Sequence, residues 1–164
     1  MLKTTLLALL IPALLLAACG GEPAGPPENM PPRAMSGEPT ETYELSLVVV
    51  EGQPAEVMQV EIFEAGTGRE AQLGDALQVH YTGWVKNSAL EFDSSYVRGS
   101  PITIKRLGAG KVIPGWELGL EGMAEGTRAR LRIPPALGYG ARGMPPVIPG
   151  NADLVFDIEL VTVL

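Results

Sequence analysis

The stretch KVIPGWELGL (residues 111–120) places one of the two tryptophans of the chain at the start of a predicted helix. Trp116, Leu120 and Met123 recur at the spacing of one helix face, and Pro114 suits the first helical turn. Two nearby glycines lower the helix propensity, so packing must hold this helix together. From spacing alone, a half-open pocket with Trp116 as its floor and a plain core remain equal alternatives.

The segments around this helix predict the strands of one antiparallel sheet. Residues 76–85 alternate between apolar and polar side chains, which places Tyr81 on one face and His80 on the other. Residues 127–133 alternate in the same way and turn three arginines, among them Arg130, outward. Further strands are predicted at residues 57–63, 102–107 and 153–164, and residues 43–51 predict a strand of uncertain membership. Together these segments predict an α+β fold, a five- to six-stranded antiparallel sheet curled around one short helix.

The chain before the folded domain divides into three shorter segments. Residues 1–19 contain Lys3 and a run of thirteen uncharged, mostly apolar residues, 6–18. This run is too short to span a membrane and is typical of a secretory signal peptide. Residues 20–42 hold six prolines and four glycines among 23 residues and predict an extended tether. Residues 43–55 are predicted as an N-terminal strand and extension, and residues 56–164 as the folded domain.

The tetrapeptide LAAC ends at Cys19, the only cysteine of the chain, and resembles a bacterial lipoprotein box. The cysteine of such a box is lipidated and anchors the protein to a membrane, whereas the alternative is an ordinary signal peptide with a chance cysteine. We expect the lipidated, exported form, because the single thiol stands at the one position that needs it. Gly20 after the cysteine, in place of aspartate, favours the outer membrane by resemblance, with the domain facing the periplasm or the cell exterior.

Charge and residue types argue against several function classes. The net charge is −7, and removal of residues 1–19 takes away one base and no acid to leave −8, which disfavours nucleic-acid binding. One histidine and one cysteine are too few for a metal centre, and the chain has no phosphate-binding loop, so we expect no metal and no other cofactor. His80, Asp93 and Ser94 could form an improvised triad, but Ser94 lacks the sharp turn around a nucleophile.

Five motifs in order resemble the FKBP-type peptidyl-prolyl cis–trans isomerases, namely VHYTGW, FDSS, KVIPGWELGLEGM, GYGARG and LVFDIEL. The resemblance runs from about Val57 to Leu164 and therefore covers the folded domain. It implies an antiparallel sheet curled around a short helix, in agreement with the strand alternation. It also implies an enzyme that acts on X–Pro bonds without a cofactor and binds proline-containing polypeptides, with macrolides as possible inhibitors.

The resemblance further implies which residues form a proline-binding pocket. The residues expected to act in catalysis are Tyr81, Phe92, Asp93, Trp116, Tyr139 and Phe156. The residues expected to bind substrate are Arg98, Ile102, Val112, Ile113, Met144, Val147 and Ile148. In this arrangement Trp116 is the floor beneath the proline ring, and the Tyr139 hydroxyl and the Ile113 N–H bind peptide carbonyls. Asp93 accepts a hydrogen bond from Tyr81 and pairs with Arg98.

Three positions depart from the pattern of the best-known family members. Ile102 stands where phenylalanine is common, Lys111 where an acid is frequent, and Met144 where a histidine often occurs. Ile102 makes a smaller pocket wall, which we expect to affect macrolide affinity more than catalysis. Met144, followed by two prolines, keeps the neighbouring loop apolar.

The sequence therefore predicts a membrane-tethered prolyl isomerase that assists exported proteins. Catalysis is expected to rest on desolvation and twisting of the imide in an aromatic pocket, without proton transfer. One alternative is a non-catalytic module, tethered to the envelope, that binds proline-containing segments or acts as a chaperone. Another is a structural surface lipoprotein, which leaves the aromatic residues beside turns unexplained.

Overall fold

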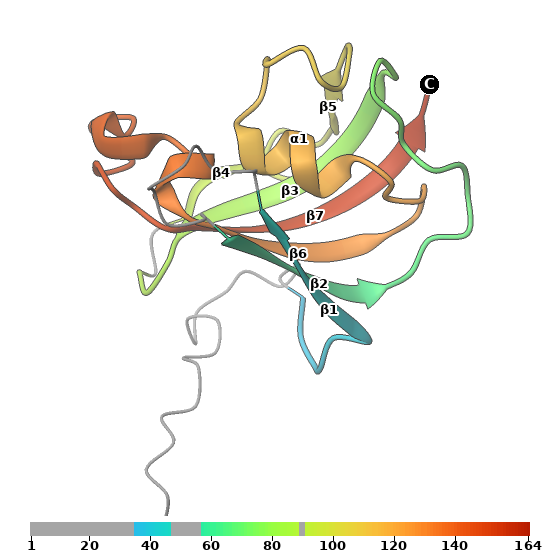
Figure 1. Cartoon of the computed structure of the whole chain (residues 1–164), viewed down its shortest axis with the longest axis horizontal. Coiled ribbons are helices and arrows are strands. Elements are labelled where there is room, and N and C mark those ends of the chain that lie inside the picture. The colour runs from blue at the N-terminus through green and yellow to red at the C-terminus, as the bar shows by residue number, and fades with distance from the viewer. Residues whose placement is uncertain (1–34, 47–56, 89–90) are drawn as a thin grey trace, which may run out of the picture.

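The computed structural model describes residues 35–46, 57–88 and 91–164, which form one sheet, one α-helix and two short 3₁₀ helices (Figure 1). The strands are β1 Glu41–Ser46, β2 Val57–Glu64, β3 Leu77–Val85, β4 Glu91–Ser94, β5 Ile102–Ile104, β6 Arg128–Ile133 and β7 Leu154–Val163. The helices are α1 Pro114–Leu120, η1 Pro135–Leu137 and η2 Gly140–Arg142. The predicted signal peptide, with Cys19, lies outside the described residues.

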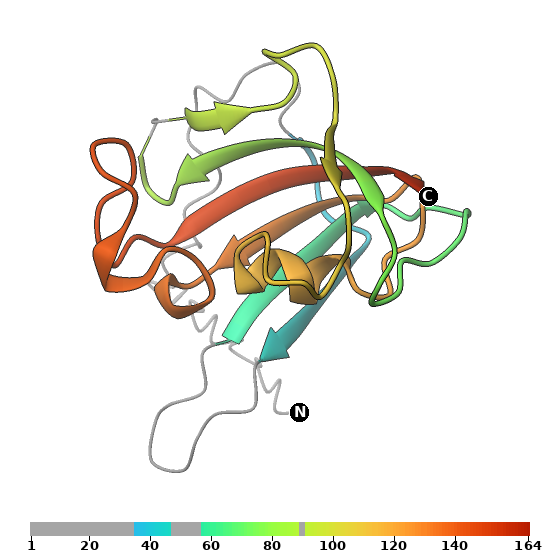
Figure 2. The same cartoon turned by 90° about the horizontal axis from the view of Figure 1, so that it is seen from above.

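All strand pairs are antiparallel, and the strand order across the sheet is β1-β2-β6-β7-β3-β4. The short strand β5 pairs with the first half of β3, and β4 pairs with its second half. The sheet curls around α1, which lies across one of its faces (Figures 1 and 2). This arrangement confirms the predicted fold class.

The described sheet has seven strands rather than five to six. The additional strand is β4, which has only four residues and therefore shows too little alternation to be predicted from sequence. The segment of uncertain membership, residues 43–51, contains most of β1, which begins at Glu41 and forms an edge strand on β2.

The helix α1 packs its predicted apolar face against the sheet. Trp116, Leu120 and Met123 are all buried, although the helix ends at Leu120 and Met123 reaches the core from the turn that follows. A Cβ atom on Gly119 would lie only 3.0 Å from the side chain of Leu131 in β6. Glycine at this position therefore weakens the helix locally but lets its backbone approach the sheet closely.

The opposite face of the sheet carries a buried ion pair. Arg130 faces away from the core, as predicted, but its side chain is only 3% exposed. Its Nε donates to Oδ1 of Asp157 at 2.7 Å, and one terminal nitrogen donates to the Met35 carbonyl at 2.9 Å. The Met35 N–H donates to Oδ2 of Asp157 at 2.7 Å. We call Met35, Arg130 and Asp157 the Met35 latch.

The last part of the predicted tether contacts the sheet. Within residues 20–42, which were predicted as a Pro/Gly-rich tether, Met35 is buried on the sheet and the Thr40 N–H donates to the Ile62 carbonyl at 2.7 Å. Proline and glycine content predicts that a segment builds no core of its own. The composition does not reveal that the backbone N–H and carbonyl of one residue, Met35, bind the Arg130–Asp157 ion pair of the sheet.

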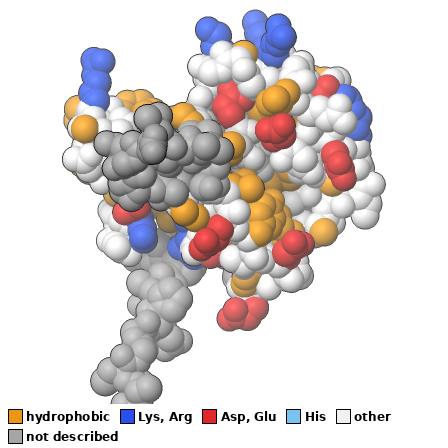
Figure 3. Space-filling view, viewed as in Figure 1, with side chains coloured by type: hydrophobic (Ala, Val, Ile, Leu, Met, Phe, Trp, Pro, Cys, Tyr) orange, Lys and Arg blue, Asp and Glu red, His pale blue; other side chains and the backbone are white. Residues whose placement is uncertain are grey.

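Charged side chains are distributed unevenly over the surface. Basic side chains gather near the top of the molecule, over the segment between β5 and α1 (Figure 3). Among the residues that the structure describes, no helix is long and apolar enough to cross a membrane.

Candidate active site

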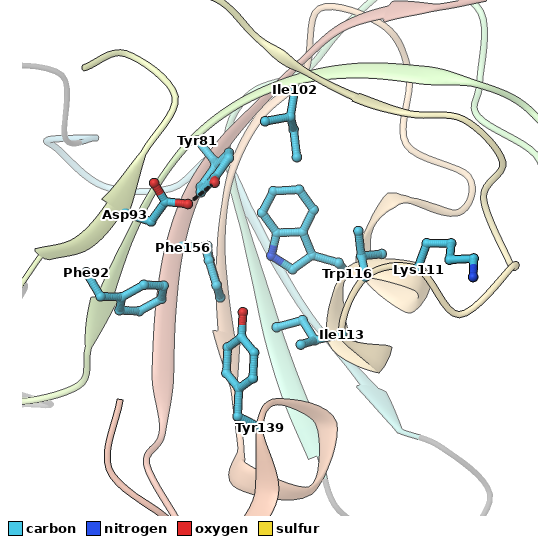
Figure 4. A pocket seen from close by; sticks show the side chains of 10 residues that line it. Tyr81, Phe92, Asp93, Ile102, Lys111, Ile113, Trp116, Tyr139 and Phe156 are labelled. Atoms are coloured by element: carbon cyan, nitrogen blue, oxygen red, sulfur yellow. Dashed lines mark hydrogen bonds between the residues drawn. The ribbon is translucent and has the colours of Figure 1, made fainter. Parts of the chain in front are cut away.

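A cavity of about 160 Å³ opens between the first turn of α1, the strands β3, β4, β5 and β7, and the loop after η1 (Figure 4). It is lined by Tyr81, Phe92, Asp93, Ile102, Lys111, Val112, Ile113, Trp116, Tyr139 and Phe156. Clefts that hold drug-sized ligands usually measure about 300–1,000 Å³. This cavity is smaller, and its size suits one ring rather than a whole ligand.

Three buried aromatic rings form the floor of the cavity. Trp116 meets Tyr81 edge-to-face at a centroid distance of 5.0 Å and Phe156 at 5.3 Å. A fourth ring, Phe92, meets Phe156 edge-to-face at 5.4 Å. Edge-to-face pairs are the preferred arrangement of aromatic side chains, so the four rings hold one another in place. Within the described residues the buried Trp116 Nε1 has no hydrogen-bond acceptor.

Gly83 makes room for two of these rings. It lies on β3 opposite Phe156 in the strand register. A Cβ atom at this position would lie 2.6 Å from the ring of Phe92 and 2.7 Å from the ring of Phe156. No other amino acid fits between the two rings without displacing them. Gly83 belongs to the site although sequence analysis assigned it no role, because glycine in a strand does not reveal which side chains approach it.

A polar cluster closes one side of the cavity. The Tyr81 hydroxyl donates to Asp93, and Arg98 bonds to the other oxygen of Asp93 and, at 2.8 Å, to the Tyr81 hydroxyl. These are the two contacts of Asp93 that the resemblance implied. Burial tends to raise the pKa of Asp93, but the hydrogen bonds from Tyr81 and Arg98 outweigh it and hold the pKa below its ordinary value. Asp93 is therefore ionised at neutral pH.

The two tyrosines of the cavity keep their protons over a wide pH range. Burial, followed by the hydrogen bond to Asp93, raises the pKa of Tyr81 to about 12. Burial and the charge of Asp93 also raise the pKa of Tyr139. Figure 4 shows the Tyr139 hydroxyl pointing from the loop after η1 into the cavity, toward the ring of Trp116. Both hydroxyls can therefore donate hydrogen bonds at neutral pH.

The structure brings together all six residues predicted for catalysis, and with them Ile102, Val112 and Ile113. Arg98 does not line the cavity but donates a hydrogen bond to Asp93, which does. Lys111, which was noted only as a departure from the family pattern, does line it.

Three residues predicted to bind substrate lie elsewhere. The Met144 N–H bonds to the Ile148 carbonyl at 2.8 Å and the Ile148 N–H to the Met144 carbonyl at 2.9 Å. These bonds close a tight loop that buries Ile148 completely in the core and leaves Met144 and Val147 exposed. None of the three lines the cavity, because motif spacing places a loop near a site without showing which way its side chains turn. Contact with a longer substrate stays a prediction for Met144 and Val147.

The improvised triad is not assembled. His80 Nδ1 lies 2.9 Å from the hydroxyl of Ser95, and the imidazole stacks on Tyr96 at 4.5 Å. The Ser94 hydroxyl instead contacts that of Thr82 at 3.0 Å. Since Asp93 bonds to Tyr81 and Arg98, no hydrogen bond joins a serine, His80 and Asp93 in series. Within the described chain, His80, Asp93 and Ser94 therefore do not form the hydrogen-bonded series that a catalytic triad requires.

Comparison with known proteins assigns the domain and its fold to a family. Residues 67–161, more than half of the chain, match the FKBP-type peptidyl-prolyl cis-trans isomerases. The chain belongs to this family. The FKBP-type domain is 55% identical over 94 residues to peptidyl-prolyl cis-trans isomerase FPR2 of Saccharomyces cerevisiae, over 57% of this chain and 69% of the relative. It is 49% identical over 104 residues to an FK506-binding protein of Neisseria meningitidis, over 63% and 94%.

Solved FKBP structures share the architecture. The crystal structure of FkpA from Escherichia coli matches with a TM-score of 0.59 and 42% identity, over 65% of this chain and 47% of FkpA. That of AtFKBP13 matches with a TM-score of 0.60 and 38% identity, over 65% and 93%. The predicted enzyme class, a peptidyl-prolyl cis–trans isomerase, is confirmed, and a non-catalytic module is not favoured.

Proposed function

We propose that this isomerase acts on X–Pro bonds of exported proteins while a lipidated Cys19 holds it at a membrane, and that the aromatic cavity is its active site. The observation that carries the proposal is the ring-sized cavity floored by Trp116, Tyr81 and Phe156. A proline ring is the part of a polypeptide that such an apolar, ring-sized space suits. The substrate class is therefore the X–Pro segment of an unfolded or partly folded client.

The residues of the cavity divide into those that bind the ring and those that bind the peptide backbone. The proline ring packs on Trp116, between Phe156 and Tyr81. The Tyr139 hydroxyl, which points into the cavity, and the Ile113 N–H at the start of α1 donate to carbonyls of the client. Asp93 stays ionised and presents its negative charge beside the imide.

Rotation about an X–Pro bond is slow because the C–N bond has partial double-bond character, and the barrier is ~18–20 kcal/mol. Water stabilises the planar, charge-separated amide by hydrogen bonding to its oxygen. A cavity of aromatic rings removes that water, and the twisted state loses less because its charge separation is smaller. Contacts that fit the twisted imide better than the planar one lower the barrier further. No proton needs to move in either effect.

We also propose that macrolides of the FK506 class bind at this cavity, with one ring inside it and the rest of the molecule outside. The Neisseria meningitidis relative carries FK506 in its name, and the family match supports a shared cavity. Ile102 lines the wall of the cavity with a small aliphatic side chain. A smaller wall makes fewer contacts with a large ligand, so macrolide affinity is expected to be lower than in relatives with an aromatic wall.

The anchor is supported by the sequence around Cys19. The single thiol follows an apolar run, and the 16 residues from there to Met35 are rich in proline and glycine. Such a tether reaches up to ~50 Å at about 3.1 Å per residue. We propose the outer membrane as the site of anchoring, with the domain in the periplasm or outside the cell, because glycine follows the cysteine.

The catalytic part of the proposal is tested with the full chain purified in detergent. Isomerisation of a short X–Pro peptide is followed by NMR exchange, and wild type is compared with Asp93→Ala and with Asp153→Ala, which replaces a half-buried aspartate outside the cavity. We expect clear acceleration by wild type and Asp153→Ala and a large loss of kcat/KM for Asp93→Ala. No acceleration by folded wild type rejects the proposed activity, and equal rates for the two variants place the site elsewhere.

The anchor is tested separately by metabolic labelling with a radioactive fatty acid. Wild type is expected to incorporate the label, and Cys19→Ser is expected to remain an unlabelled precursor. Equal labelling of both proteins ends the lipoprotein proposal without affecting the proposed activity.

A further inference from the structure

Three basic side chains belong to the segment that follows one cavity residue, Ile102, and reaches another, Lys111. Between residues 94 and 116 the chain has four bases and no acid, although the whole protein carries a net charge of −7. Three of these bases, Lys105, Arg106 and Lys111, belong to the exposed segment between β5 and α1, where basic side chains gather in Figure 3. We call these three residues the basic rim.

Within the described chain the basic rim has no carboxylate partner. Among the residues that the structure describes, six bases lie within 4.0 Å of a carboxylate, and these are Arg69, Lys86, Arg98, Arg128, Arg130 and Arg132. No carboxylate of the described chain lies within that distance of a rim residue. The charges of the rim are therefore not used to hold the fold and remain available to a ligand.

The segment that carries the rim is held rigidly. Leu107 is buried, its N–H donates to the Asp75 carbonyl at 2.8 Å, and its carbonyl accepts from the Gly74 N–H at 2.9 Å. Glu117 of α1 accepts hydrogen bonds from two further amides of the segment, Gly108 N–H and, at 2.9 Å, Gly110 N–H. A ligand that binds a preorganised surface loses less entropy in ordering it.

Lys111 places this charge at the mouth of the cavity. It lines the cavity next to Val112 and Ile113, but Figure 4 shows its ammonium extending away from the ring of Trp116. The ammonium can therefore meet residues that flank a bound proline, and not the proline itself. On the other side of the cavity Arg98 already neutralises Asp93, whereas the rim segment holds three bases against the single carboxylate of Glu117 and therefore keeps a positive charge.

We propose that the basic rim selects clients that carry aspartate or glutamate directly before or after the X–Pro unit. The inference rests on the proposed function, because it assumes that the proline occupies the cavity. Each exposed ion pair contributes little, but three fixed cations of one sign act together on the encounter rate and on binding. We expect about a three- to tenfold preference for an acidic over a neutral flanking residue at low salt. Salt at ~1 M shortens the screening length to about 3 Å and removes most of this preference.

The experiment uses the full chain in an uncharged detergent and three sets of X–Pro peptides. The peptides carry Glu, Gln or Lys at one of the two positions before or after the X–Pro unit. Rates are measured by NMR exchange at about 10 mM and about 1 M NaCl, where the screening lengths are ~30 Å and ~3 Å. At low salt kcat/KM is expected to fall in the order Glu, Gln, Lys at one or more of the positions. The three rates are expected to converge at high salt.

A charge-neutral variant and a matched control identify the source of the preference. In the triple variant K105Q/R106Q/K111Q the ratio of the Glu to the Gln rate is expected to fall to about one. In K86Q, which removes a lysine outside the cavity that already lies 4.0 Å from Asp153, the ratio is expected to stay at the wild-type value. Using the ratio for each protein removes any general change in activity caused by the substitutions.

The outcomes separate this inference from the proposed function. If no peptide is isomerised faster than in buffer, the proposed function fails and the rim has no client to select. If all peptides are isomerised at the same rate, or if the triple variant keeps the preference, the inference is wrong while the function stands. Binding of wild type and the triple variant to anionic vesicles is measured in addition. If only wild type binds the vesicles and the Glu, Gln and Lys peptides are isomerised at equal rates, the inference is wrong and the rim contacts a membrane surface.

Discussion

Replacing Gly83 by alanine tests whether the arrangement of the aromatic rings, rather than their presence, determines catalysis. The substitution adds one methyl group and removes none of the residues that line the cavity. The added carbon would stand 2.6 Å from the ring of Phe92 and 2.7 Å from that of Phe156. Carbon atoms in good contact are about 3.5–4.0 Å apart, so the two rings must each retreat by about 1 Å. Both line the cavity, and the edge-to-face contact between them cannot survive such a shift unchanged.

The effect on activity should exceed the effect on stability. Overpacking a core usually costs about 1–3 kcal/mol. Gly83 lies outside the positive-φ region, so alanine is tolerated by the backbone and restores about 0.4–1 kcal/mol by restricting the unfolded chain. We therefore expect a net loss of about 1–2 kcal/mol, measured by urea unfolding. A displacement of ~1 Å in a site can cost about a hundredfold in rate, so kcat/KM of the folded variant should fall by ~10- to 100-fold.

Gly68→Ala provides a matched control for this substitution. Its added carbon would lie 2.7 Å from the Cβ of Glu125, which does not line the cavity. This variant should lose stability to a similar degree and keep its kcat/KM within about twofold. A role of the ring arrangement in catalysis is refuted if folded Gly83→Ala keeps wild-type kcat/KM. It is equally refuted if Gly68→Ala loses as much activity, because the effect is then one of overpacking in general.

Three further predictions concern separate parts of the protein. Arg130→Ala should lower the free energy of unfolding by about 3–5 kcal/mol in urea titration, because it leaves the buried charge of Asp157 without a partner; an unchanged midpoint contradicts this. Because the pKa of Asp93 is lowered, its paired, ionised form is lost only as pH falls below the ordinary aspartate range, so kcat/KM should be flat from about pH 6 to 8. His80 does not line the cavity, so His80→Ala should keep most activity. A tenfold fall per pH unit in this range contradicts that assignment. Phe156→Ala should lower the free energy of unfolding by ~3–5 kcal/mol and should also lower kcat/KM of the protein that circular dichroism shows to be folded. Folded Phe156→Ala with normal turnover places the site elsewhere.

Periodicity was sufficient to predict the elements that build the fold. The spacing of Trp116, Leu120 and Met123 identified the helix, and alternation identified the longer strands, because burial on one face imposes a period that is visible in sequence. The strand β4 was missed since four residues hold too few repeats. Alternation also assigned Arg130 to the outer face correctly, but it cannot reveal that another segment covers that face.

The site was predictable where a motif and a regular element coincide. Tyr81 and Phe156 lie on neighbouring strands, so their positions follow from the sheet, and the family motifs placed Trp116 at the start of α1. Sequence did not specify the side-chain directions in the loop after η2, where two hydrogen bonds join Met144 to Ile148 and the Ile148 side chain enters the core. Such bonds depend on the path of a whole loop, which neither periodicity nor motif spacing specifies.

The Met35 latch has a mechanical consequence for the membrane anchoring that we propose at Cys19. Tension on such an anchor would enter the chain before residue 35 and meet the latch first, where Asp157 binds the N–H and Arg130 the carbonyl of Met35. These residues belong to β6 and β7, two central strands with partners on both sides. The edge strand β1 follows the latch along the chain. Its hydrogen bonds to β2 could break one after another under tension. A pull on the tether is therefore transmitted to the centre of the sheet, and the strand most easily unzipped is shielded from it.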